Sequence, residues 1–161
     1  MKYVLTLFLL TISFLPQLTA QVVSDTLPKV FLIGEHEAQY NKMIANSPDL
    51  LMSVCKNDMD KAYAKWLSFL VGLEKAAIEN DVNINGVKIW INVFWDEKGA
   101  IKHIAFYPKP NSKNMEYEYL SALLKEYAGT FEVGLENTKM FAHYGSASFP
   151  SFISSTEKQN K

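Results

Sequence analysis

The sequence contains little cysteine and no excess of either charge. Its 161 residues include one cysteine, Cys55, so an intramolecular disulfide is excluded, and either the core stabilises the fold or the thiol pairs with another chain. Cys55 lies in the apolar stretch LLMSVCKND, which favours a buried, inert thiol over a nucleophile. The 16 basic and 17 acidic residues nearly cancel, which argues against nucleic acid or an anionic membrane surface as a partner. No Cys-x-x-Cys or His-Glu-x-x-His spacing occurs, so neither a metal site nor a cofactor is predicted.

The first 20 residues are expected to form a signal peptide. Lys2 supplies the positive charge, residues 4–15 an apolar run, and Leu18-Thr19-Ala20 a cleavage site after Ala20. The apolar run is shorter than the ~20 residues that a membrane-spanning helix needs, so an uncleaved anchor is the less favoured alternative. We therefore expect a periplasmic or secreted protein with no stable membrane span after cleavage.

The remaining chain is predicted to be one α+β domain. Residues 21–29 are interpreted as a linker, 30–84 as a helical part, 85–152 as a small antiparallel sheet with a helix, and 153–161 as a flexible tail. Nearly half of the residues are apolar, which suffices for one core and is too little for two. The clearest local pattern is an apolar stripe that predicts a helix over 58–80, with Trp66 in the core. Gly72 weakens this helix unless close packing requires it.

From residue 85 the apolar pattern changes from a helical period to a period of two, which predicts a β-hairpin. One strand ends at the turn Asp96–Gly99, and the second covers 100–108. A helix over 115–131 and a last strand over 139–149, interrupted at Gly145, are expected to follow. On the first strand, alternation separates two faces: Val87, Ile89, Ile91, Val93 and Trp95 against Lys88, Trp90, Asn92, Phe94 and Asp96. On the second strand it groups Ile101 with His103, Ala105 and Tyr107.

The second face of this hairpin needs a cover because it carries two large aromatic residues. Trp90 and Phe94 lie on the face that an ordinary two-layer domain leaves to solvent. The favoured interpretation is that the helix over 58–80 lies across them. The alternative is that they form a surface for a second copy of the chain or for another protein, where aromatic residues are enriched.

The order of these motifs resembles the carboxyl-terminal domain of TonB-like proteins. The resemblance rests on NGVKIWINVFWDEKGAIKHIAFYPKPNSKN, a helix, and KMFAHYGSASFPSF, and it covers about residues 85–152. The segments FWDEKG, KPNS and HYGSASFP also resemble a group of uncharacterised secreted proteins of Bacteroidetes. The TonB resemblance implies a β-β-α-β unit that pairs with a short segment of an outer-membrane transporter by strand addition. This chain departs from TonB proteins in its cleavable amino terminus and in lacking a proline-rich spacer, so the resemblance implies the binding mode rather than energy transduction.

We therefore predict a non-enzymatic envelope protein that acts by protein–protein interaction, with a partner's strand added at a sheet edge. The partner would be an envelope protein or peptide, or a second copy of the chain. A binding module for a glycan or peptide is the alternative, with a cleft lined by tryptophan and by the loops at 111–114 and 143–146. A hydrolase would need His103 or His143 beside a serine, and no third orienting residue is evident. The candidate binding residues are Trp90, Phe94, Asn111, Ser112, His143 and Tyr144.

Overall fold

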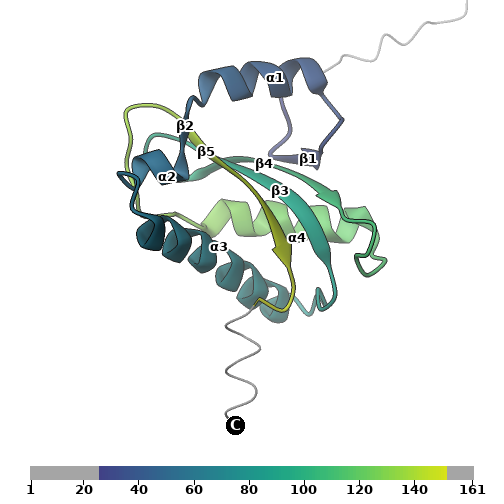
Figure 1. Cartoon of the computed structure of the whole chain (residues 1–161). Helices are drawn as coiled ribbons and strands as arrows, with labels where there is room; N and C mark the ends of the chain where they lie inside the picture. Colours follow the sequence, from purple (N-terminus) through teal and green to yellow (C-terminus); the bar gives the residue numbers. More distant parts are fainter. Residues whose placement is uncertain (1–25, 152–161) are drawn as a thin grey trace, which may run out of the picture.

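The computed structural model describes residues 26–151, in which a five-stranded sheet lies between helices (Figure 1). The predicted α+β class is confirmed. The expected signal peptide, the linker up to residue 25 and the tail over 153–161 lie outside the described residues. The elements in chain order are β1 (Val30–Leu32), α1 (Glu37–Asn46), β2 (Asp49–Leu50), α2 (Leu51–Val54), α3 (Met59–Glu79), β3 (Lys88–Trp95), β4 (Ile101–Pro108), α4 (Tyr117–Thr130) and β5 (Phe141–Ser148).

The sheet has the strand order β1-β4-β3-β5-β2. The central strand β3 is antiparallel to both β4 and β5, which confirms the predicted hairpin. The part of the chain predicted to be helical also contributes two short edge strands, of which β1 is parallel to β4 and β2 is parallel to β5. No helix of residues 26–151 is long and apolar enough to cross a membrane.

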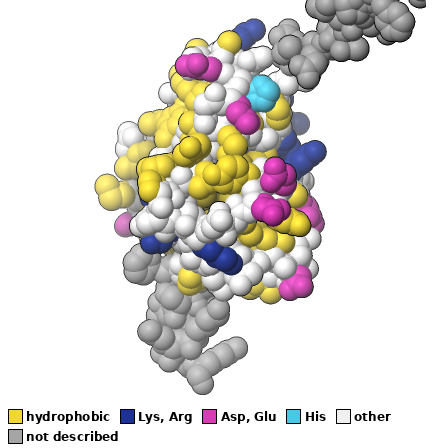
Figure 2. Space-filling model, turned by 90° about the vertical axis from the view of Figure 1, so that its right-hand side faces the viewer, with side chains coloured by type: hydrophobic (Ala, Val, Ile, Leu, Met, Phe, Trp, Pro, Cys, Tyr) yellow, Lys and Arg dark blue, Asp and Glu magenta, His cyan; other side chains and the backbone are white. Residues whose placement is uncertain are grey.

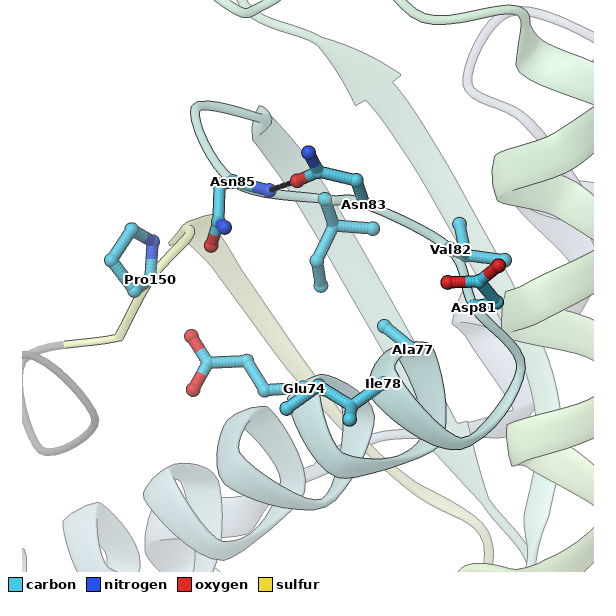
Figure 3. Close-up of a pocket in the computed structure, with 9 residues that line it drawn as sticks. Glu74, Ala77, Ile78, Asp81, Val82, Asn83, Asn85 and Pro150 are labelled. Atoms are coloured by element: carbon cyan, nitrogen blue, oxygen red, sulfur yellow. Dashed lines mark hydrogen bonds between the residues drawn. The ribbon is translucent and has the colours of Figure 1, made fainter.

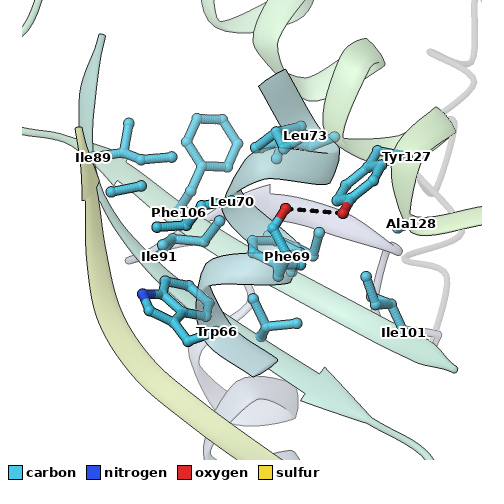
Figure 4. Packing of buried hydrophobic residues seen from close by; sticks show 14 of the residues in the cluster. Trp66, Phe69, Leu70, Leu73, Ile89, Ile91, Ile101, Phe106, Tyr127 and Ala128 are labelled. Atoms are coloured by element: carbon cyan, nitrogen blue, oxygen red, sulfur yellow. Dashed lines mark hydrogen bonds between the residues drawn. The ribbon is translucent and has the colours of Figure 1, made fainter. Parts of the chain in front are cut away.

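The main core lies between the sheet and two helices, α3 and α4 (Figure 4). The predicted helix over 58–80 is confirmed as α3, which begins after Asp58, whose side chain accepts a hydrogen bond from the Lys61 N–H at 3.0 Å. The predicted face of β3 from Ile89 to Trp95 is fully buried against these helices. Side chains that pack there from α3 and α4 include Trp66, Phe69, Leu70, Leu73, Leu120, Leu124 and Tyr127.

A β-bulge changes the predicted faces of β4. Phe94 lies opposite His103, whereas the next residue, Trp95, lies opposite Ile101, so Lys102 is the extra residue. The bulge turns Ile101 toward the main core together with Ile104 and Phe106. The prediction that Ile101 shares a face with His103 and Tyr107 is therefore wrong, because strict alternation takes no account of an inserted residue.

The second face of the sheet is covered by α1, and only in part. Phe94 is buried there with Phe31 and Met43, whereas 44% of the Trp90 side chain is exposed. The prediction that the long helix covers Trp90 and Phe94 is wrong, since α3 packs on the opposite face (Figure 1). Both faces carry apolar residues, and the alternation alone does not say which helix meets which face.

The last strand is also more regular than predicted. β5 runs without interruption through Gly145, which lies opposite Ile91. A Cβ on Gly145 would lie 2.8 Å from the His143 ring and 3.5 Å from Trp66. Glycine here leaves room for the His143 ring, and it does not mark a break in the strand.

The contact between α3 and α4 depends on Gly72. The Tyr127 hydroxyl donates a hydrogen bond of 2.8 Å to the Phe69 carbonyl (Figure 4), and a Cβ on Gly72 would overlap that hydroxyl. Burial raises the pKa of the Tyr127 phenol, so it remains a neutral donor. Close packing thus accounts for a glycine in the middle of this helix.

We predict that Gly72→Ala lowers the free energy of unfolding by about 1–3 kcal/mol despite the higher helix propensity of alanine, because the methyl group displaces Tyr127. The matched control is Gly129→Ala in α4, where a new Cβ meets nothing within 4 Å. That change is expected to stabilise the fold by about 0.5–1 kcal/mol. Urea unfolding measures both, and a stabilising effect of Gly72→Ala would contradict the packing.

Candidate functional site

Three aromatic side chains lie on the half of the second face that α1 leaves uncovered. We call Trp90, Tyr107 and Tyr144 the aromatic shelf; their exposed fractions are 44%, 48% and 41%. Trp90 and Tyr107 are opposite each other on β3 and β4, and their rings stack with centroids 6.5 Å apart. Figure 2 shows hydrophobic side chains gathered at the centre of one side of the molecule, with acidic side chains at their border and lysines further out. Exposed aromatic clusters of this kind are typical of binding surfaces.

Tyr40 of α1 contacts the residues that lie beside the shelf. The Asn92 side-chain amide donates a hydrogen bond of 2.6 Å to the Tyr40 hydroxyl, and the Tyr40 ring meets Phe94 edge to face. Phe94 in turn meets Tyr144 edge to face, with centroids 5.8 Å apart. Burial, with a smaller contribution from Tyr40, raises the pKa of the Tyr144 phenol. A shallow hollow of about 560 Å³ lies over this region, lined by Ile33, Trp90, Asn92, Tyr144, Gly145 and Ser146.

Two lysines stand at the rim of the shelf. The Lys109 ammonium lies 5.7 Å from the centre of the Trp90 ring, a cation–π distance. Lys88 lies on the same face of β3 as Trp90, opposite Ser148 on β5. Neither lysine has an ion-pair partner within the part of the chain that the structure describes. Among the described residues, neither charge is therefore neutralised by a direct ion pair.

The outer side of β5 is an open sheet edge. β3 pairs with all of β5 on one side, whereas β2 pairs on the other side with Phe141 and Ala142 alone. The Phe149 N–H donates to the Val87 carbonyl, so odd-numbered residues of β5 bond to β3 and even-numbered ones point outward. The backbone groups of Tyr144, Ser146 and Ser148 thus point away from the sheet, without a backbone partner among residues 26–151. We call this stretch, 144–148, the β5 edge.

An apolar side of α3 lies beneath the β5 edge. Trp66 packs under Gly145, and eight residues further along the helix the Glu74 carboxylate accepts hydrogen bonds from Ser151. These two contacts place the helix alongside the end of β5. Helical periodicity then puts on this side, together with Glu74, the apolar residues Tyr63, Leu67 and Leu70.

The structure brings together two of the six predicted site residues, Trp90 and Tyr144. Phe94 is buried under α1, and Asn111 is exposed in the loop after β4. The Ser112 hydroxyl accepts a hydrogen bond of 2.9 Å from the Lys88 N–H, so it ties this loop to the start of β3. Trp95 is fully buried, so the predicted cleft of tryptophan and these loops does not form.

The sixth residue, His143, lies on the opposite face from the shelf. Its ring packs against Trp66 with centroids 4.3 Å apart. His103 lies on the other face, with its Nδ1 hydrogen-bonded to the Pro28 carbonyl at 2.8 Å. The sheet separates the two histidines, and it separates His143 from Ser146 as well. The base and nucleophile pair considered from the sequence is therefore not assembled here.

Sequence reasoning missed three residues of the site, Tyr107, Lys88 and Lys109, and it placed Ser146 in a loop rather than at a strand edge. The period of two assigned Tyr107 and Lys88 to a face of the sheet. It could not say which residues lie beside them, because that depends on the register between the strands. Ser146 has no chemical signature of its own, and it matters because it leaves Trp90 accessible from the edge. The signal that could have found Tyr107 is its aromatic ring on the second strand of a hairpin with Trp90 on the first.

A second hollow, of about 280 Å³, lies between the end of α3 and the loop over 81–85 (Figure 3). Glu74 points into it from α3, and Pro150 borders it on the other side. The Glu74 carboxylate is already engaged by the Ser151 N–H and, at 2.8 Å, by the Ser151 hydroxyl. Within residues 26–151 no three His, Cys, Asp or Glu side chains gather in a way that could hold a metal ion. We assign this hollow an anchoring role for the chain that leaves β5.

We predict that His143 makes the fold less stable in acid. Burial lowers the pKa of His143 below its ordinary value, so the unfolded chain binds the proton more readily than the folded one. The free energy of unfolding therefore falls as the pH drops through about 6.5 toward the folded pKa. Urea unfolding between about pH 7.5 and 5 should show a smaller loss for His143→Gln than for the wild type. An unchanged pH slope would contradict this assignment.

Comparison of the chain with known protein-family models, curated proteins and solved structures finds no match in any of the three. The resemblance to TonB-like domains therefore stays a prediction from the motifs. What the site does has to be argued from its own residues, namely an exposed aromatic shelf with a lysine rim beside an open sheet edge.

Proposed function

We propose that this protein binds a partner protein or peptide outside the cytoplasm by adding one of the partner's strands to the β5 edge. The observation that carries the proposal is the outward-pointing backbone of Tyr144, Ser146 and Ser148, which has no neighbouring strand among the described residues. Each of these residues offers one N–H and one C=O to a further strand. Strand addition of this kind is a general mode of peptide recognition.

The composition of the edge supports a role in pairing. Natural sheets usually protect an exposed edge with lysine, proline or a bulge, or by keeping the edge strand very short. The other side of the sheet follows that rule, since the edge strand β1 has three residues. The β5 edge has the sequence YGSAS, which contains neither a charge nor a proline. An unprotected edge is a liability unless a partner uses it.

Side chains on both sides of the edge would add to the main-chain bonds. Each net hydrogen bond contributes only about 0.5–1.5 kcal/mol, so a few of them give weak binding by themselves. Beneath the edge, the half-buried Leu67 of α3 offers an apolar surface. Above it, the aromatic shelf offers exposed ring surface. An added strand alternates its side chains between these two surfaces, which gives it contacts on both faces.

The glycan-binding alternative has less support. It requires Trp90 or Trp95 to share a cleft with Asn111 and Ser112, whereas Trp95 is buried and Ser112 bonds to the backbone of Lys88. The hollow over Trp90 is shallow and continues to the β5 edge through Gly145 and Ser146. We therefore favour a strand over a sugar as the occupant.

We predict that Ser146→Pro abolishes peptide binding without unfolding the protein. The Ser146 N–H points outward, so proline removes a donor from the edge while the bonds between β5 and β3 remain. The control is Ser146→Ala, which keeps the N–H and adds no bulk to the edge. The probe is a phage library of random ten-residue peptides, selected on the chain from Gln21 onward.

The expected result is a set of peptides that bind the wild type and Ser146→Ala but not Ser146→Pro. Such peptides should also slow amide hydrogen exchange at Tyr144, Ser146 and Ser148. Urea unfolding verifies that the proline variant is folded. If the selection yields no peptide whose binding depends on the edge, the proposal is refuted.

A further inference from the structure

We infer that the partner's strand carries a large apolar side chain and, two residues away on the same face, an acidic side chain, which contact Trp90 and Lys88 respectively. This inference rests on the proposed strand addition at the β5 edge and specifies the chemistry of the partner. The inference follows from the small side chains of Ser146 and Ser148, which lie on β5 between the edge and these two residues of β3.

Two serines leave Trp90 and Lys88 within reach of an added strand. Ser146 lies opposite Trp90, and Ser148 lies opposite Lys88, with all four side chains on the shelf face. Adjacent strands are about 4.8 Å apart, so an added strand lies about 10 Å from β3. A long or aromatic side chain that passes over a serine can span that gap, as diagonal neighbours do in sheets. At Tyr144 the bulk of the ring closes the same path.

The position of the added strand that lies beside Ser146 favours a large apolar residue. Trp90 is 44% exposed, and the hollow of about 560 Å³ beside it is bordered by Ser146 and Gly145 on the edge side. A large apolar side chain that lies in this hollow against Trp90 would bury part of the tryptophan ring and exclude water from it. Buried tryptophans at the centre of an interface are the residues that contribute most to affinity.

The position of the added strand that lies beside Ser148 favours an acidic residue. Lys88 has no ion-pair partner among the described residues, and Lys109, close to the Trp90 ring, adds a second positive charge to the same rim. An aspartate or glutamate would compensate this charge, whereas a lysine would be repelled. Specificity by repulsion of the wrong partner is common at such surfaces. The partner residue between these two points to the other face of the sheet, toward the half-buried Leu67 of α3.

The order of the two residues reports the direction of the added strand. An antiparallel strand passes Ser148 before Ser146, so the acidic residue precedes the apolar one by two positions. A parallel strand reverses this order. Both arrangements put the same two side chains over the same two serines.

The test uses the edge-dependent peptides from the random ten-residue library, defined by their loss of binding to Ser146→Pro. We expect these peptides to share an acidic and a large apolar residue two positions apart. For a synthetic peptide of this type, Trp90→Ala should weaken binding about thirtyfold and Lys88→Glu about fivefold. A peptide with lysine in place of its acid should bind Lys88→Glu better than it binds the wild type.

Two matched variants control for general effects on the surface. Tyr119→Ala removes an aromatic residue of α4 that is 61% exposed and lies outside the shelf, and Lys102→Glu reverses an exposed lysine at the bulge of β4. Neither should change binding. This inference is overturned if the edge-dependent peptides lack the shared pair of residues. It is also overturned if their binding does not respond to Trp90→Ala and Lys88→Glu. Either outcome leaves strand addition standing. A library without edge-dependent peptides would overturn both.

Discussion

The structure depends on the pairing of β3 with a strand on each side. Its backbone bonds alternate between β4 and β5, and its side chains alternate between the main core and the second face. The core side, from Ile89 to Trp95, is fully buried under α3 and α4, so a shift in register by one residue would expose it to α1 and solvent. The same register determines which backbone groups of β5 turn outward. The set of β5 backbone groups that face the edge is therefore a consequence of how the core strand is placed.

The length of α1 determines how much of the second face is left for binding. A helix of ten residues is about 15 Å long, whereas a strand of eight residues such as β3 extends over about 26 Å. One helix of this size cannot cover the whole face. Tyr40 marks the limit of the cover, because its hydroxyl accepts the hydrogen bond from Asn92. On one side of Asn92 the ring of Phe94 is buried, and on the other side the ring of Trp90 is exposed.

The parts of the fold that depend on local periodicity were predictable, and the parts that depend on pairing between distant segments were not. The stripe of α3 and the alternation of β3 are local, and both predictions are confirmed. The bulge at Lys102 and the cover of Phe94 by α1 have no local signal. At the site, Trp90 and Tyr144 were predicted from their chemistry. The β5 edge could not be predicted, because it exists only where the two-residue strand β2 stops.

An open edge supplies affinity without selectivity, since main-chain bonds are the same for every sequence. Selectivity has to come from side chains that an added strand can reach, and the residues of β5 decide which ones those are. Tyr144 blocks one route across the sheet, whereas Ser146 and Ser148 leave two routes open, to Trp90 and to Lys88. Larger residues at these two positions would protect the edge better and would also hide the shelf from a partner. The two serines thus connect the generic part of the site to its specific part.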